Sequence, residues 1–96
     1  YELSLQDYGD YPLHEAAGRG YPSIANLLLQ AGATVDAVND WGRTALHCAA
    51  LWGKIQVVEA LLNAGADKAV KKDNGKTALD LAQQMNYPAI VKLLRD

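Results

Sequence analysis

A histidine stands directly before the single cysteine of the chain, as His47 and Cys48, and this pair is the first candidate for chemistry. A cysteine nucleophile needs a base within hydrogen-bond reach and a third group that orients the base. Successive residues of a helix point about 100° apart, so the two side chains do not face each other if this segment is helical. The sequence indicates no orienting group. We therefore interpret both residues as structural, and predict that the protein is not an enzyme.

His14 raises the hypothesis of a metal site, because Glu15 follows it and Asp10 precedes it by four residues. A structural zinc site uses four ligands with characteristic spacings, and these three groups meet neither condition. We therefore interpret His14 as a histidine of the core. The sequence also lacks the phosphate-binding patterns G-x-x-x-x-G-K-[ST] and G-x-G-x-x-G. We predict no metal site and no cofactor.

The charges of the chain argue against nucleic acid as a partner. Residues 1–48 carry six acids and two bases, a net charge of −4, and residues 49–96 carry five acids and seven bases, a net charge of +2. Neither half has the basic excess that binding to a phosphate backbone requires. Four lysines nevertheless gather at positions 68, 71, 72 and 76, interleaved with Asp67 and Asp73. They form either a solvated surface or a rim that attracts an acidic partner.

The sequence also bears on location. No stretch approaches the roughly 20 apolar residues that a membrane-spanning helix needs, and no basic and apolar leader opens the chain. One cysteine excludes an internal disulfide framework and is compatible with a reducing compartment. We expect no membrane span and an intracellular location, in the cytoplasm, the nucleus or the interior of an organelle.

The candidate residues lie on a 33-residue repeat. Residues 7–39 and 40–72 are identical at 12 of 33 positions, and residues 40–63 and 73–96 at 8 of 24. A period of this length indicates one supersecondary unit stacked on copies of itself. We predict three units, at residues 7–39, 40–72 and 73–96, in a single domain. Residues 1–6 are interpreted as the tail of a preceding unit or as an extended N-terminal segment.

Each unit predicts a turn, a short helix, a break and a longer helix. Thr44 and Thr77 are placed to cap the short helices of their units. Gly32 and Gly65 are placed to end the longer helices in the left-handed conformation. The predicted short helices span Pro12–Gly18, Ala45–Leu51 and Ala78–Gln84, and the predicted longer helices span Pro22–Ala31, Ile55–Ala64 and Pro88–Arg95.

The middle unit reads D-W-G-R-T-A-L-H-C-A-A-L-W-G and continues V-V-E-A-L-L-N-A-G-A-D, and it closely resembles the ankyrin repeat. The resemblance covers residues 7–96 in three registered copies. It implies an all-α solenoid of three helix-turn-helix units with hairpin-like loops. It also implies that Thr44 and His47, which match the T-x-L-H box, form side-chain bonds that tie neighbouring units together. Tyr11 replaces the threonine of this box in the first unit, and Asp80 replaces its histidine in the last unit. We interpret the last unit as a polar closing cap.

Bulky apolar residues at variable positions of the repeat are the strongest indication of function. Trp41 is expected at a loop tip, and Leu51 and Trp52 at the end of the short helix, on the concave face that ankyrin arrays use for binding. Tyr8 and Met85 lie one period from Trp41 and Trp52. Tryptophan, tyrosine and arginine dominate interface hot spots. The predicted protein-binding residues are Tyr8, Asp10, Arg19, Trp41, Arg43, Leu51, Trp52, Lys76 and Met85, and the predicted structural residues are Thr44, His47, Thr77, Gly32 and Gly65.

We therefore predict a non-catalytic module that binds a protein or peptide through its loop tips and the concave face of its short helices. One alternative is a structural spacer or an oligomerisation segment, in which the aromatic residues join chains. Another is an engineered ankyrin binder, since selection for binding yields tryptophans at variable positions. A structural role for the tryptophans also stays open, with Trp52 folded over the helix ends and Trp41 packed on a neighbouring loop.

Overall fold

The computed structural model of the 96-residue chain describes residues 12–95, and these residues form six α-helices joined by loops, with no strand among them. Short helices alternate with longer ones along the chain. The helices are α1 (Pro12–Arg19), α2 (Pro22–Gln30), α3 (Ala45–Leu51), α4 (Ile55–Asn63), α5 (Ala78–Gln84) and α6 (Pro88–Arg95). The sequence therefore predicts every helix to within one residue at each end.

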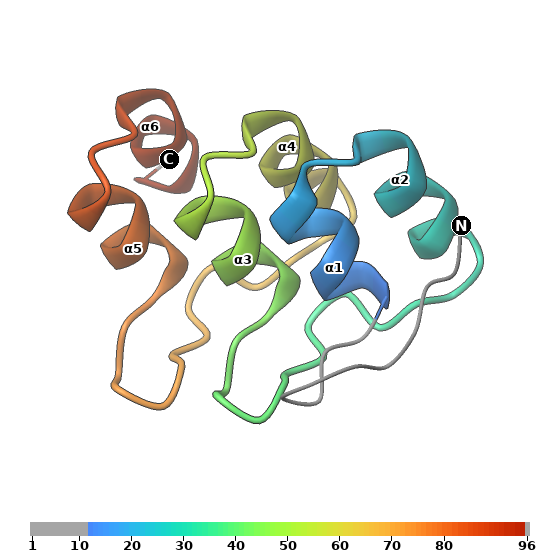
Figure 1. The fold of residues 1–96 in the computed structure, drawn as a ribbon, viewed down its shortest axis with the longest axis horizontal. Helices are drawn as coiled ribbons and strands as arrows, with labels where there is room; N and C mark the ends of the chain where they lie inside the picture. Colours follow the sequence, from blue (N-terminus) through green and yellow to red (C-terminus); the bar gives the residue numbers. More distant parts are fainter. Residues whose placement is uncertain (1–11, 96) are drawn as a thin grey trace.

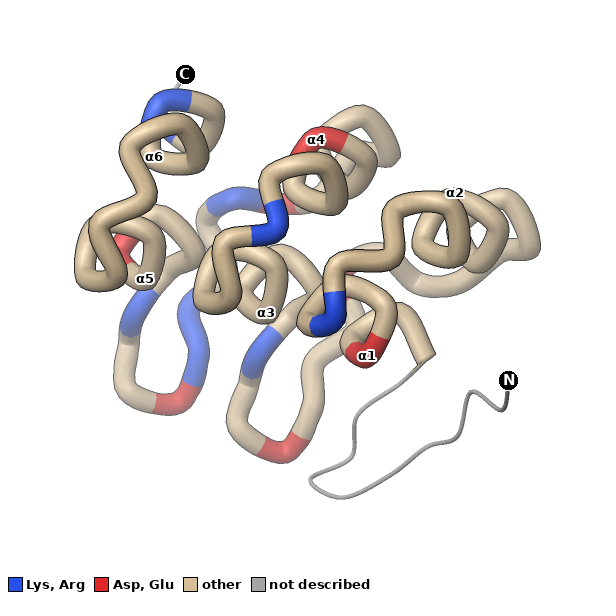
Figure 2. The backbone as a smooth tube through the Cα atoms, turned by 45° about the horizontal axis from the view of Figure 1, so that its top comes forward, with Lys and Arg blue, Asp and Glu red and all other residues tan. Residues whose placement is uncertain are grey.

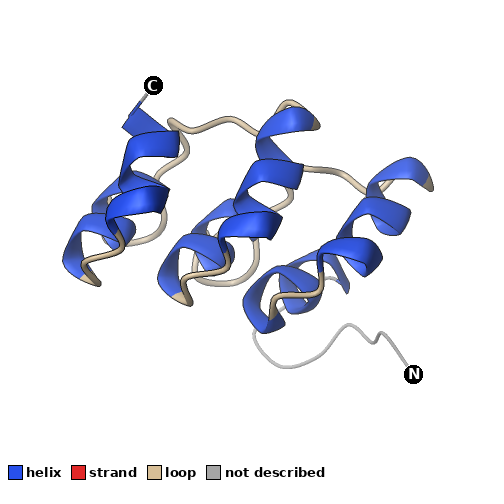
Figure 3. Ribbon diagram, turned by 90° about the horizontal axis from the view of Figure 1, so that it is seen from above, coloured by secondary structure: helices blue, strands red, loops and turns tan. Residues whose placement is uncertain are grey.

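The helices stack as three antiparallel pairs, α1–α2, α3–α4 and α5–α6 (Figure 1). Within this stack α1, α3 and α5 pack side by side in one row, and α2, α4 and α6 form the second row. The same two rows are seen from above in Figure 3. Two hairpin loops project from the row of short helices, away from the long helices. We call residues 39–43 the first hairpin loop and residues 72–76 the second hairpin loop.

Threonine side chains begin two of the short helices, as predicted. The Thr44 hydroxyl accepts a hydrogen bond from the backbone N–H of His47, and the Thr44 N–H donates to Nδ1 of His47. In the last unit the Thr77 N–H donates to the Asp80 carboxylate at 3.0 Å. This bond is the main reason why the pKa of Asp80 lies below its usual value. The aspartate thus replaces the box histidine in its capping role.

Turns with positive φ separate the elements. Positive φ angles occur at Gly20, Gly32, Gly42, Gly53, Gly65, Gly75 and Asn86, which include both predicted helix-closing glycines. The first hairpin loop closes through a hydrogen bond from Asn39 N–H to the Arg43 carbonyl. The second closes through the equivalent bond from Lys72 N–H to the Lys76 carbonyl. The hairpin-like loops that the resemblance implied are therefore present.

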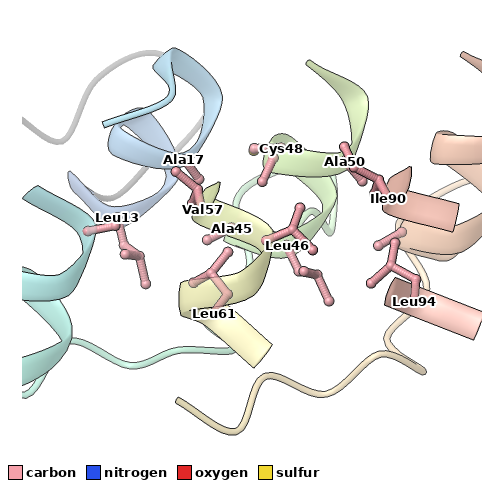
Figure 4. Packing of buried hydrophobic residues seen from close by; sticks show 14 of the residues in the cluster. Leu13, Ala17, Ala45, Leu46, Cys48, Ala50, Val57, Leu61, Ile90 and Leu94 are labelled. Carbon is pink, nitrogen blue, oxygen red and sulfur yellow. The ribbon is translucent and has the colours of Figure 1, made fainter. Parts of the chain in front are cut away.

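The core lies between the helix pairs and consists of alanine and aliphatic residues (Figure 4). Alanines at the contacts of the short helices, such as Ala16, Ala49 and Ala82, are fully buried, and their small size lets the helices approach closely. Val57 and Leu61 of α4 are fully buried against their neighbours. The stacked pairs thus share one continuous core, which no single pair could form alone.

Several sequence predictions concern residues outside the described range. The interpretation of residues 1–6, and the binding roles of Tyr8 and Asp10, concern residues that the structure does not describe. Between residues 12 and 95, no helix combines the length and apolar character that a membrane crossing requires.

Candidate protein-binding surface

Trp52 directly follows α3, and 58% of its surface is exposed. The ring nevertheless rests on the preceding unit, because a Cβ built on Gly18 of α1 would lie 3.5 Å from Cδ1 of Trp52 and 3.8 Å from its Nε1. The absence of a side chain at Gly18 thus leaves space between α1 and the indole. The Cδ1–Nε1 edge of Trp52 therefore lies close to α1, while more than half of the residue stays open to solvent. These surroundings agree in part with the structural interpretation and in part with the binding interpretation.

Trp41 lies at the tip of the first hairpin loop and is 40% exposed. The buried side chain of Asn39 shapes this loop, because its Oδ1 accepts hydrogen bonds from the N–H groups of Trp41 and Arg43, both at 3.0 Å. Gly42 adopts a φ of +72° between them. The guanidinium carbon of Arg43 stands 4.9 Å from the centre of the Trp41 ring, a cation–π arrangement.

The two hairpin loops are joined at Trp41. The backbone N–H of Asp73 donates to the carbonyl oxygen of Trp41 at 2.9 Å. A Cβ on Gly42 would lie 2.7 Å from the Asp73 carboxylate and 3.3 Å from Cα of Lys72, so the loops are in close contact. A side chain at position 42 would force them apart. The backbone that carries Trp41 is thereby held from both sides.

The third unit continues the exposed surface. Met85 follows α5 one period after Trp52 and is 42% exposed. The ammonium group of Lys76, on the second hairpin loop, donates to the side-chain oxygen of Gln84 in the last turn of α5. This bond brings the side chain of Lys76, in the second hairpin loop, next to the side chain of Gln84, at the end of α5. The corresponding residues one period earlier are Arg43 and Leu51, and Leu51 is half-buried.

Arg19 ends α1 one period before Trp52 and forms an ion pair with Glu15, with 3.3 Å between Nε and Oε1. The two residues are one helical turn apart, and the arginine side chain is 60% exposed. An exposed pair of this kind contributes little to stability. Arg19 therefore adds a partly neutralised charge to the rim of the surface near Trp52.

These residues form a strip along the short helices and not a compact cluster. We call Arg19, Trp41, Arg43, Leu51, Trp52, Lys76 and Met85 the hairpin-side strip. Trp41 and Trp52 lie at opposite ends of α3, whose seven residues span about 10 Å. Figure 2 shows basic residues on the arms of both hairpin loops and acidic residues close to their tips. The strip therefore combines exposed apolar side chains with mixed charge.

The histidines considered for chemistry have structural partners. His47 is buried, and its Nε2 lies 3.1 Å from the carbonyl oxygen of Lys76 in the next unit. Burial lowers the pKa of His47, in opposition to the hydrogen bond from the ring to Lys76. His14 is also buried, and its Nε2 lies 2.8 Å from the carbonyl oxygen of Arg43. Both histidines thus tie a short helix to the following hairpin loop.

The remaining candidate for chemistry is also buried. Cys48 lies in α3 with 8% of its surface exposed. Within residues 12–95, no three His, Cys, Asp or Glu side chains are grouped so that they could hold a metal ion. The three candidates for chemistry among the described residues, His14, His47 and Cys48, are therefore all buried in the stack.

Three residues of this surface were missed by sequence reasoning. Asn39 shapes the first hairpin loop, Gly18 supports Trp52, and Gln84 holds Lys76. An asparagine just before a D-x-G turn is a known turn signal, so Asn39 was open to prediction. Gly18 and Gln84 carry no such local signal, because their roles depend on neighbouring elements.

Comparison with protein families agrees with this architecture. The family model described as ankyrin repeats (three copies) matches residues 13–96. The match covers the six helices except for Pro12, and it covers both hairpin loops and thus the whole hairpin-side strip.

Proposed function

This chain belongs to the ankyrin repeat family, whose members generally serve as protein-interaction modules, and we propose that it binds a protein or peptide through the hairpin-side strip. The observation that carries the proposal is that both tryptophans of the chain, Trp41 and Trp52, are exposed and that each is in contact with a neighbouring unit. Large aromatic side chains that are held rigidly lose little entropy on binding. They are also typical anchors of interfaces.

The support of each tryptophan makes this strip a prepared surface. Asn39 and the contact with Asp73 hold the backbone at Trp41, and α1 at Gly18 lies close to the Cδ1–Nε1 edge of the Trp52 ring. A partner that covers the open faces would remove apolar area from water, at about 25 cal/mol per Å² before the costs of association. The charged residues along the strip would then set the orientation of the partner.

The test is affinity capture from a cell lysate with the wild-type chain and a double variant, Trp41→Ala with Trp52→Ala. Leu27→Ala is the matched control, because Leu27 is 64% exposed on the long helix α2, outside the strip. We expect a protein that the wild type and the Leu27 variant retain and that the double variant loses, while all three give the same helical circular dichroism. Retention by the double variant would contradict the proposal.

The two tryptophans also provide a direct readout. Since the chain has no other tryptophan, a partner that covers the strip should shift the fluorescence emission to shorter wavelengths. A dimer that buries the tryptophans would give the same shift in the isolated chain as its concentration rises. Light scattering separates the two cases, because it measures the molar mass of the isolated chain. A mass that doubles as the concentration rises supports the oligomerisation alternative, and a constant monomer mass supports a separate partner.

A further inference from the structure

The basic side chains of the hairpin loops indicate what kind of partner the strip accepts. We propose that Arg43, with Lys76 at the equivalent position of the next hairpin loop, binds a carboxylate of an acidic protein segment whose apolar side chain packs on Trp41. This inference rests on the proposed function, because it names the chemistry of the partner at the same strip.

The backbone of Arg43 is fixed on both sides. Its N–H donates to Oδ1 of Asn39, and its carbonyl oxygen accepts from Asn39 N–H and lies 2.8 Å from Nε2 of His14. The guanidinium carbon stands 4.9 Å from the centre of the Trp41 ring. The arginine therefore loses less conformational freedom on binding than an unsupported surface arginine does.

The charge of Arg43 is unmatched within the described chain. Glu15 forms an ion pair with Arg19, and among residues 12–95 no carboxylate forms an ion pair with Arg43. Its Nε is buried without a hydrogen-bond partner. The terminal nitrogens Nη1 and Nη2 are not among the buried atoms without a partner, and their paired N–H groups match the two oxygens of a carboxylate.

Neighbouring lysines strengthen the positive charge at this point. Lys71, Lys72 and Lys76 of the second hairpin loop likewise form no ion pair with a described carboxylate. Lys72 lies beside the first hairpin loop, at Gly42, and Lys76 is held toward the strip by the neutral amide of Gln84. The positive charges of Lys72 and Arg43 both lower the pKa of the buried His47, so the two act on the same region.

Acidic residues near the loop tips limit the kind of anion that fits. Asp40 and Asp73 flank Trp41 along the chain and across the hairpin contact. A polyanionic backbone would place further negative charge beside them, whereas a protein segment can present one or two carboxylates between apolar residues. Nucleic acid is therefore disfavoured, in agreement with the small basic excess of the chain.

The probe for the test is a random peptide library displayed on phage, selected on the immobilised wild-type chain. We expect enrichment of peptides with aspartate or glutamate within a few residues of a bulky apolar side chain. Single peptides from the selection should bind Arg43→Gln about 10- to 100-fold more weakly, which corresponds to losing a charge-assisted hydrogen bond. Arg43→Lys should retain only part of the binding, because lysine keeps the charge but not the paired donors.

Two controls make the result decisive. Lys92→Gln removes an exposed cation of α6, outside the strip, and should leave peptide binding unchanged. If the wild type enriches no more peptides than the double tryptophan variant, the proposed function fails and this inference falls with it. If the wild type enriches apolar peptides without acidic residues, or Arg43→Gln binds the acidic peptides like wild type, the carboxylate site is disproved while the proposed function stands.

Discussion

The imidazole Nε2 of His47 lies 3.1 Å from the carbonyl oxygen of Lys76, and this contact joins the middle unit to the next hairpin loop. Nδ1 of the same ring accepts from the N–H of Thr44, so Nε2 carries the proton and donates to Lys76. His14 repeats the contact to Arg43 one unit earlier. The two histidines thus link the units and also hold the backbones of Arg43 and Lys76. Arg43 and Lys76 are the basic residues that the hairpin loops contribute to the strip.

Replacing His47 by alanine should destabilise the fold. The change removes a buried hydrogen bond between the ring and the Thr44 N–H and a part-buried one between the ring and the Lys76 carbonyl. We expect the free energy of unfolding to fall by about 2–3 kcal/mol, measured by urea denaturation followed by circular dichroism. Glu59→Ala, at an exposed position of α4, is the control and should change stability by less than about 0.5 kcal/mol. Equal effects of the two changes would show that the His47 contacts contribute little.

Acidification should weaken the fold through the same histidine. Burial lowers the pKa of His47 below 6.5, so the unfolded chain binds its proton more readily than the folded chain. The stability from the neutral ring is fully present above about pH 6.5 and is lost as the pH falls from there through the lowered pKa. For one proton, the limiting slope is about 1.4 kcal/mol per pH unit.

Urea denaturation at several pH values between 7.5 and 5 measures this dependence. The window lies above the range of ordinary aspartates and glutamates, so Asp80, whose pKa is lowered, does not contribute there. The His47→Ala variant should lose part of the slope seen in the wild type. Parallel curves for the two proteins would show that His47 does not titrate differently on unfolding.

Two glycines with the same backbone conformation should respond differently to alanine. Gly53 and Gly65 have φ of +71° and +89°, so alanine is strained at both, at about 1 kcal/mol. A Cβ on Gly65 meets nothing within 4 Å, whereas one on Gly53 would lie 2.9 Å from the ring of Tyr87 in the next unit. Gly53→Ala must also displace this ring and lose its packing.

Denaturation curves of the two variants should therefore differ. We expect Gly53→Ala to be less stable than Gly65→Ala by about 1–2 kcal/mol, in the range found for overpacked sites. Because Gly65 carries the backbone strain alone, the difference isolates the contact with Tyr87. Similar stabilities would mean that the ring moves aside at no cost and that this contact does not join the second unit to the third.

Local signals in the sequence account for how well the helices were predicted. Pro12, Pro22 and Pro88 mark helix starts, and Thr44 and Thr77 cap helices through bonds to residues three positions away. Such signals depend on nearby residues and on the period, so they can be read from one sequence. The helix ends shift by one residue because the last turn depends on its final hydrogen bonds.

The strip was less predictable, since its details depend on contacts between units. The indole of Trp52 rests on Gly18, which is 34 residues away in the chain. Arg43 stands over Trp41, whereas its counterpart Lys76 extends to Gln84, although both hold the same position of the repeat. The exposure of both tryptophans agrees with the predicted surface. The binding roles of the residues in the strip stay predictions, and so does the intracellular location.

The contact between Gly18 and Trp52 makes an unusual prediction, that filling the space under an exposed tryptophan stabilises the protein. Gly18 lies in α1 without a positive φ, so alanine fits the helical backbone. Its Cβ would lie 3.5 Å from the Trp52 ring, an ordinary van der Waals distance. We expect Gly18→Ala to raise the free energy of unfolding by about 0.5–1 kcal/mol, because glycine is a poor helix former.

Gly32→Ala is the matched control for this change. Gly32 has nothing within 4 Å of its Cβ position, but its φ of +96° makes alanine strained, so the control should lose about 1 kcal/mol in the same urea titration. Both variants add one methyl group. Changes of opposite sign in the free energy of unfolding would therefore separate the effect of backbone strain from the effect of packing. Added contact beside the ring should also leave capture of a partner intact, since the exposed part of Trp52 is unchanged. A destabilised Gly18→Ala variant would show instead that the indole presses on α1 too closely to admit a methyl group, and the support assigned to Trp52 would have to be redrawn.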